Sequence, residues 1–101
     1  MTQQELLKKV RLHLAWIDDT ITAKNSDYSD KNDAFNNFRY SEELGITSTD
    51  KAMFVRMCDK MSRIANLLNK EANVKDETIH DTLLDLAAYS ILLSIYIDDG
   101  K

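Results

Sequence analysis

The chain contains no proline and only two glycines, Gly45 and Gly100, among its 101 residues. These two residue types interrupt α-helices most strongly. Proline lacks the amide hydrogen and clashes with the preceding turn, and glycine loses more backbone entropy than other residues when it is ordered. Their scarcity leaves long stretches in which helices can form. The sequence therefore predicts an all-α protein, a small bundle of about four helices.

The length of the chain predicts a single domain of residues 1–101, because folding at this size buries roughly 65% of the unfolded surface, enough for one core. Hydrophobic residues make up 44% of the chain and charged residues 30%, which is typical of soluble globular proteins. The single cysteine, Cys58, lies in a helical apolar pattern, which predicts a buried thiol in a reducing compartment.

The partners and the location follow from charge and hydropathy. The net charge of −4 argues against direct binding to DNA or RNA, which usually needs a positive surface. The N-terminus lacks the apolar segment of a signal peptide, and no apolar run approaches the roughly 20 residues that span a membrane. We therefore expect a cytoplasmic protein that contacts no membrane and binds small molecules or proteins.

Helical periodicity is clearest in the first segment, where apolar residues recur at steps of three and four and predict an amphipathic helix over about 3–24. Its apolar stripe consists of Leu7, Val10, Leu14, Ile17 and Ile21. Such a stripe suits a partner helix, and it predicts a homodimer or a higher homo-oligomer. The polar stretch KNSDYSDKND, residues 24–33, predicts a loop.

The rest of the chain predicts one short and two long helices. In the short helix, Ala34, Phe35, Phe38 and Leu44 face the core and Gly45 lies just past the end. Thr47 or Thr49 would cap the next helix, over 51–70. That helix has an inner stripe of Met53, Met57, Met61, Ile64 and Leu68. The last helix is expected over 76–97.

Two charged patterns indicate a binding site. Glu77, Asp81 and Asp85 follow one another at intervals of four, so they share one side of the last helix, where Mg²⁺ or basic side chains would relieve their repulsion. Arg56, Lys60 and Arg63 form a band on the preceding helix that could hold phosphate. The alternative interpretation of both patterns is a solvated face with salt bridges between helices.

Three segments carry a family resemblance: KNSDYSDKNDAF, FVRMCDKMSRIANLL and VKDETIHDTLLDLAAYSILL. Their most specific residues are Lys24, Asn25, Asp27, Tyr28, Arg56, Asp59, Lys60, Arg63, Glu77, Asp81, Asp85 and Tyr89. Most of the chain after residue 20 thereby resembles the nucleotide modification associated domain family, the first of several so named, which is common in phage genomes. The resemblance implies a nucleotide-associated site in the cytoplasm of a phage-infected bacterial cell.

The resemblance implies two groups of site residues. The nucleotide and its phosphates would contact Lys24, Asn25, Tyr28, Arg56, Lys60 and Arg63. A magnesium ion would contact Glu77, Asp81 and Asp85, together with Asp59 or Asp27.

In architecture that family is similar to the all-α nucleotide pyrophosphatases of the MazG and dimeric dUTPase type. Those enzymes hold Mg²⁺ with a Glu-Glu-x-x-Glu run on one helix and a Glu-x-x-Asp pair on another. Here Glu42 and Glu43 lie near a helix end with no third glutamate in register, so no catalytic residue is assigned.

The incomplete carboxylate set favours a phage-type protein that binds, or sequesters, a phosphorylated nucleotide in a helical pocket. One alternative is a Mg²⁺-dependent nucleotide pyrophosphohydrolase, or an accessory enzyme of modified-nucleotide metabolism. A protein interaction module is a third possibility.

Overall fold

A computed structural model describes residues 1–28, 31–69 and 78–100, the side chain of Tyr28 excepted. The long helices are α1 (Gln3–Tyr28), α3 (Thr49–Asn69) and α4 (Ile79–Ile95). Two shorter elements, the 3₁₀ turn η1 (Asn36–Phe38) and α2 (Tyr40–Glu43), join α1 to α3, and a π-helical turn, η2 (Tyr96–Gly100), follows α4. These ranges contain no β-strand, so the all-α prediction is confirmed.

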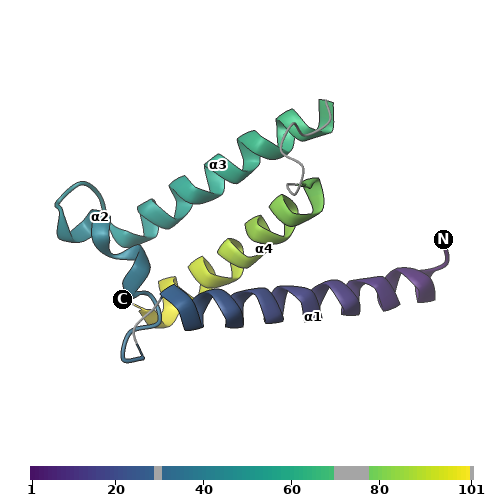
Figure 1. Cartoon of the computed structure of the whole chain (residues 1–101), viewed down its shortest axis with the longest axis horizontal. Helices are drawn as coiled ribbons and strands as arrows, with labels where there is room; N and C mark the ends of the chain where they lie inside the picture. The colour runs from purple at the N-terminus through teal and green to yellow at the C-terminus, as the bar shows by residue number, and fades with distance from the viewer. Residues whose placement is uncertain (29–30, 70–77, 101) are drawn as a thin grey trace.

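Helix α4 lies between α1 and α3 and packs against both (Figure 1). The molecule measures 47 × 30 × 22 Å. The N-terminal half of α1 extends well past the start of α4 (Figure 1). Within the described residues, no helix is long and apolar enough to cross a membrane.

The end of α1 corrects the loop predicted over 24–33, because the helix continues to Tyr28. Two polar side chains of this stretch have partners elsewhere in the chain. Lys24 pairs with Asp85, and the Asn25 amide donates to the carbonyl of Ala34 at 3.0 Å. These side chains therefore do not compete with the helical hydrogen bonds of their own backbone, as the prediction had assumed.

The connection between α1 and α3 has less helix than predicted. Phe38 is buried and Phe35 partly buried, as expected, but Leu44 is 57% exposed and Ala34 is exposed too. Gly45 follows the end of α2 with φ of +75°, a left-handed conformation that glycine adopts at little cost, so its predicted place is confirmed.

Helix α3 begins at Thr49, which is therefore not its N-cap. The Thr49 hydroxyl is fully buried and donates to Oε2 of Glu42 at 3.1 Å, which closes the corner between α2 and α3.

The predicted inner stripe of α3 is confirmed only in part. Met53 is fully buried, but Met61 and Leu68 are exposed, since the described residues place no neighbouring helix over that side.

Helix α4 begins three residues later than predicted, because Thr78 caps it. The Thr78 hydroxyl accepts from the Asp81 backbone amide at 3.2 Å and donates to the Asp81 carboxylate at 2.9 Å. This reciprocal pair satisfies one of the amides that a helix start leaves without a partner. Asp76 and Glu77 lie outside the described residues.

Two small hydrophobic clusters hold the helices together. One joins α1 to α4 through Ile17, Leu84 and Ala88. The other joins η1, α3 and η2 through Phe38, Met53 and Tyr96. The predicted buried thiol is not found, because Cys58 is exposed on α3.

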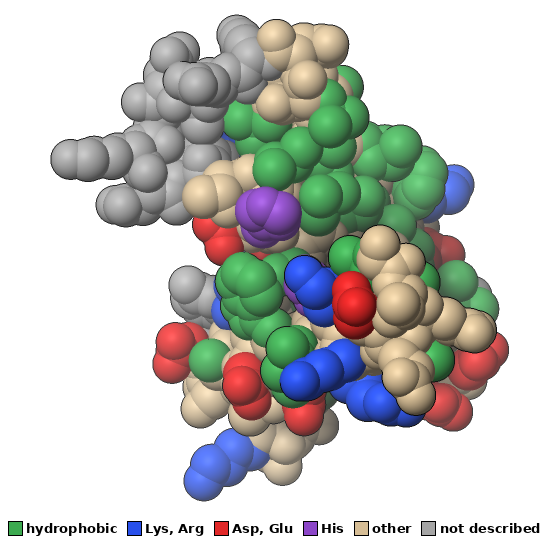
Figure 2. Space-filling view, turned by 90° about the vertical axis from the view of Figure 1, so that its right-hand side faces the viewer, with side chains coloured by type: hydrophobic (Ala, Val, Ile, Leu, Met, Phe, Trp, Pro, Cys, Tyr) green, Lys and Arg blue, Asp and Glu red, His purple; other side chains and the backbone are tan. Residues whose placement is uncertain are grey.

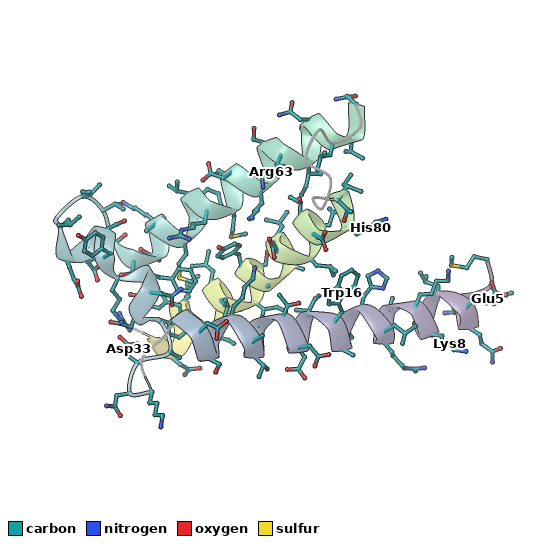
Figure 3. All side chains as sticks on the ribbon, in the orientation of Figure 1. Glu5, Lys8, Trp16, Asp33, Arg63 and His80 are labelled. Carbon is teal, nitrogen blue, oxygen red and sulfur yellow. The ribbon has the colours of Figure 1, made fainter. Side chains whose placement is uncertain are left out.

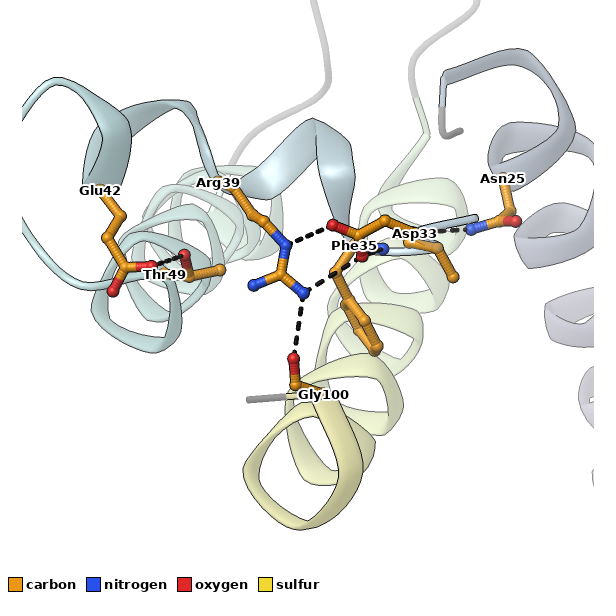
Figure 4. Close-up of polar contacts among 8 residues, drawn as sticks. Asn25, Asp33, Phe35, Arg39, Glu42, Thr49 and Gly100 are labelled. Atoms are coloured by element: carbon orange, nitrogen blue, oxygen red, sulfur yellow. Dashed lines mark hydrogen bonds and ion pairs between the residues drawn. The ribbon is translucent and has the colours of Figure 1, made fainter. Parts of the chain in front are cut away.

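Arg39 fastens the C-terminal turn to the connection between α1 and α3 (Figure 4). Its guanidinium makes a two-pronged bond to the Asp33 carboxylate, and its Nη2 also donates to the Gly100 carbonyl at 3.0 Å. The same group lies over the Tyr96 ring, 5.6 Å from the centroid. The bond from Arg39 holds the pKa of Asp33 below its usual value.

Candidate functional site

Asp85 joins the three long helices through two lysines. Its Oδ1 accepts from Nζ of Lys24 on α1 at 3.0 Å, and its Oδ2 accepts from Nζ of Lys60 on α3 at 3.1 Å. The Asp85 side chain is only 21% exposed. Asp85 on α4 therefore has partners on both α1 and α3.

The two lysines decide the ionisation of Asp85. Burial of the carboxylate would raise its pKa, but the hydrogen bonds and charges of Lys24 and Lys60 outweigh burial and hold the pKa below the ordinary value of 3.8. Asp85 is therefore ionised at neutral pH and shares its negative charge between two ammonium groups.

A cavity of about 180 Å³, here called the aromatic cavity, lies between the C-terminal part of α1, η1 and the middle of α4. Aromatic side chains of Phe38 and Tyr89 line it, with their ring centroids 6.0 Å apart in an edge-on arrangement. The amides of Asn25 and Asn37 line it too, next to the charged side chains of Lys24, Arg56 and Asp85. Rings with a few amides are the usual lining of a small-molecule site.

Two further cavities are lined by most of the Lys and Arg side chains of the predicted site. The lysine cavity, of about 360 Å³, is lined by Lys24, Lys60 and Arg63 together with Trp16 and Asp81. The arginine cavity, of about 270 Å³, is lined by Arg56, Asp59, Lys60, Arg63 and Tyr89. In Figure 3 Arg63 projects from α3 on the side of α4, and Trp16 projects from α1 toward the start of α4.

The three cavities share walls, so they form one connected surface. Lys24 and Asp85 line both the aromatic and the lysine cavities, and Lys60 and Arg63 line both the lysine and the arginine cavities. Arg56 lines the aromatic and the arginine cavities, and its guanidinium lies 5.9 Å from the centroid of the Phe38 ring. Aromatic rings and cations thus meet around Asp85.

The structure brings most of the predicted phosphate-binding residues together. Lys24, Asn25, Arg56, Lys60 and Arg63 all line one of the three cavities. The Tyr28 side chain, also predicted to contact nucleotide, is outside the described part of the chain.

The predicted acidic stripe divides into residues with different roles. Asp85 holds two lysines, whereas Asp81 belongs to the cap of α4. Asp59 lines the arginine cavity, Asp27 lies exposed near the end of α1, and Glu77 is not described. Within residues 1–28, 31–69 and 78–100, no three Asp, Glu, His or Cys side chains are grouped as metal ligands.

Sequence reasoning missed part of the site. It assigned Phe38 to the core, where the structure also places it, without expecting its ring to line a cavity, and it gave Asn37 and Trp16 no role in binding. Asn37 and Phe38 reach the cavity because Asn25 and Arg39 fasten their segment to α1 and to η2. These are contacts between distant parts of the chain, for which the residue pattern carries no signal.

A scan against protein-family models found no match, and searches of curated proteins and solved structures found no significant relative.

Proposed function

We propose that the protein binds a phosphorylated nucleotide across the three connected cavities. One observation carries the proposal: a cavity lined by two aromatic rings and two amides adjoins a surface with four cationic side chains, in a chain of net charge −4. A ligand that suits both parts has a flat, partly apolar group joined to an anion. A nucleotide has this composition.

The aromatic cavity would receive the base. Any of the bases can stack on an aromatic side chain, because every base has a flat π-face, and amides can hydrogen-bond to the edge of the base. Phe38 and Tyr89 provide the rings, and Asn25 and Asn37 provide the amides. Asn25 is held by its bond to the Ala34 carbonyl, so its position is fixed before a ligand binds.

The cations on α3 would receive the phosphates. The guanidinium groups of Arg56 and Arg63 can each bond two phosphate oxygens, and Lys60 adds a compact charge between them. All three lie on one helix, which holds them more rigidly than a loop would. Pairing with Asp85 neutralises part of the charge of Lys24 and Lys60. The arginines are expected to contribute most of the affinity because each guanidinium can bond two phosphate oxygens at once.

Magnesium enters this proposal only with the nucleotide. An ion already bound to phosphates needs one or two protein carboxylates, and Asp59 and Asp81 line the two cavities that we assign to the phosphates. Pyrophosphohydrolase activity would require more carboxylates than the described residues bring together, so we propose binding without assigning a reaction.

Calorimetric titration with a panel of nucleoside mono-, di- and triphosphates tests the proposal, in EDTA and in Mg²⁺. The parent nucleosides and inorganic pyrophosphate serve as partial ligands, and chromatography of the recovered nucleotide reports any turnover. We expect a phosphorylated nucleotide to bind more tightly than either partial ligand. Absence of binding for the whole panel at concentrations on the order of 1 mM, the range of about −4 kcal/mol, would overturn the proposal.

The matched variants are Tyr89→Leu in the aromatic cavity and Tyr40→Leu on α2, where the tyrosine is 67% exposed. Tyr89→Leu should lower the affinity for nucleotides while the affinity for inorganic pyrophosphate persists, because only the nucleotides stack on the ring. Tyr40→Leu should leave both affinities unchanged. Equal nucleotide affinity in the wild type and Tyr89→Leu would place the base elsewhere.

A further inference from the structure

The lysine and aromatic cavities together form one groove along α1 and α4, which run side by side in the same general direction (Figure 1). The wall on α1 consists of Trp16, Thr20 and Lys24, whose intervals of four place them on one side of the helix. Trp16 lines the lysine cavity, whereas Thr20 and Lys24 line both cavities. The groove therefore has an aromatic side chain at its far end, outside the aromatic cavity.

The wall on α4 has the same spacing. Asp81 lines the lysine cavity, Asp85 lines both cavities, and Tyr89 lines the aromatic cavity. Eight residues separate Trp16 from Lys24 on one wall and Asp81 from Tyr89 on the other, which is about 12 Å along each helix. Trp16 and Tyr89 therefore lie toward opposite ends of the groove, with charged side chains between them.

A single base cannot stack on both of these rings. A flat group held between two rings contacts each at about 3.5 to 4 Å, so the rings would have to lie about 7 to 8 Å apart. The spacing along the groove is larger than this. A ligand that uses both ends needs two flat groups joined by a linker, and the linker would lie beside Lys24, Lys60 and Arg63.

Trp16 is available to such a second group. It is 45% exposed and belongs to neither hydrophobic cluster of the described residues. The His13 ring lies beside it, with the centroids 6.2 Å apart, and Nδ1 of His13 donates to the Lys9 carbonyl at 2.8 Å, which limits movement of the imidazole. Figure 2, which faces the end where α1 begins, shows hydrophobic and basic side chains mixed on this part of the surface. A ligand that is partly aromatic and partly anionic suits such a surface.

The charges of the lysine cavity favour a linker of low charge. Its lining includes three basic and two acidic side chains, which leaves a net charge of +1: Lys24, Lys60, Arg63, Asp81 and Asp85. A phosphodiester between two nucleosides carries one negative charge. A longer strand would place further phosphates outside the groove, on a chain whose net charge is −4.

We infer that the ligand is a dinucleotide, two nucleosides joined by a phosphodiester, and this inference rests on the nucleotide site proposed above. One base stacks in the aromatic cavity on Phe38 and Tyr89. The linking phosphate faces Lys60 and Arg63. The second base stacks on Trp16, so this residue determines whether a dinucleotide is preferred to a mononucleotide.

Fluorescence titration tests the second base directly, because Trp16 is the only tryptophan in the chain. Dinucleoside monophosphates that cover all base combinations serve as probes, and the corresponding mononucleotides serve as references. The best dinucleoside monophosphate should change the tryptophan fluorescence and should bind roughly tenfold more tightly than its mononucleotides, the gain from stacking one further base. Mononucleotides at concentrations that saturate the site in calorimetry should leave the fluorescence unchanged.

Three variants separate the Trp16 ring from the rest of the site. Trp16→Leu should lower the affinity for the dinucleoside monophosphate roughly tenfold and leave the affinity for mononucleotides unchanged. Trp16→Phe should keep most of the preference because it retains a ring. Tyr40→Leu, which removes an exposed ring from α2, should leave both affinities unchanged. Circular dichroism of each variant reports whether the helices persist.

The failure of this inference differs from the failure of the proposed function. Equal affinity for dinucleoside monophosphates and mononucleotides in the wild type, without a change in fluorescence, would overturn the dinucleotide and leave the nucleotide site standing. Tighter binding of a tetranucleotide than of the dinucleoside monophosphate would also overturn the dinucleotide, in favour of a longer strand. Absence of binding by every mononucleotide and every dinucleoside monophosphate would overturn both.

Discussion

Lys60 on α3 donates to Asp85 on α4 at 3.1 Å, and this ion pair lies where the aromatic, lysine and arginine cavities adjoin. With the bond from Lys24, a single carboxylate links all three long helices. Asp85 therefore holds the fold together at the same point where the proposed ligand would bind. Its substitution is expected to affect stability first.

Asp85→Asn should destabilise the protein by about 2 kcal/mol, because the half-buried Lys60 and the more exposed Lys24 lose their counter-charge while the volume is unchanged. For a chain of this size the melting temperature should fall by roughly 10 °C at fixed protein concentration. Asp98→Asn, at an exposed aspartate of η2, is the matched control. If Asp85 were instead a magnesium ligand with unrelieved repulsion, Asp85→Asn would stabilise the protein in EDTA.

Acid should destabilise the protein below about pH 4 through two carboxylates. The pKa values of Asp33 and Asp85 both lie below the ordinary 3.8 in the folded state. The stability that they contribute is complete above the unfolded value and is lost as the pH falls through the lowered folded value. Urea denaturation between pH 6 and pH 2.5 should show this loss, with a shallower slope in Asp85→Asn. An identical slope in the variant would mean that Asp85 is not the titrating group.

Arg39→Lys should destabilise the protein by about 1.5 kcal/mol, although it keeps the charge. A lysine cannot bond both oxygens of Asp33 and the Gly100 carbonyl from one planar group. Thermal melting followed by circular dichroism measures the change, with Arg11→Lys on the exposed side of α1 as control. Equal melting temperatures for both variants would show that charge alone suffices at position 39.

Thr78→Ala should cost about 1 kcal/mol, because the first turn of α4 loses its cap. Thr22→Ala within α1 is the control, since the Thr22 hydroxyl makes only a long hydrogen bond of 3.4 Å to Asp18 on an exposed surface. The loss in Thr78→Ala should be the same in EDTA and in Mg²⁺. A loss that Mg²⁺ reverses would indicate that Asp81 serves a metal rather than the cap.

Arg63→Ala should weaken nucleotide binding roughly tenfold, the effect of losing one charge-assisted bond to phosphate, with little change in stability. Lys51→Ala removes a positive charge from the start of the same helix and should leave binding unchanged. Isothermal titration in parallel with thermal melting separates the two properties. Equal affinity of Arg63→Ala and the wild type would indicate that the α3 cations form a solvated face.

The sequence predicted the helices well where one feature decided the outcome. Without proline, α1, α3 and α4 run uninterrupted, and Gly45 marks the turn where its left-handed backbone is required. The residues at which helices end were harder to predict, because they depend on side-chain partners elsewhere in the chain. Lys24 and Asn25 continue α1 past its predicted end since their side chains bond other segments.

The Lys and Arg side chains that line the candidate site could be predicted from the sequence, but the partners of its carboxylates could not. Spacing places Asp81 and Asp85 on one side of α4, but it does not reveal which neighbour each one meets. A signal for Asp81 was present in the spacing from Thr78, a threonine followed three residues later by an acid, which is typical of a helix cap. No comparable signal existed for Asn37 or Phe38, whose role depends on how a distant segment folds back onto α1.

The attachment of α1 through its second half also determines how this helix forms. Ile17, Ile21 and Lys24 fix that half to α4, whereas residues 3–16 would be only marginally helical alone at such a length. In a single chain the helix therefore grows outward from its docked end toward Met1. Its backbone amides should exchange with solvent deuterium in a gradient along the helix, fastest near Gln3 and slowest near Ile21.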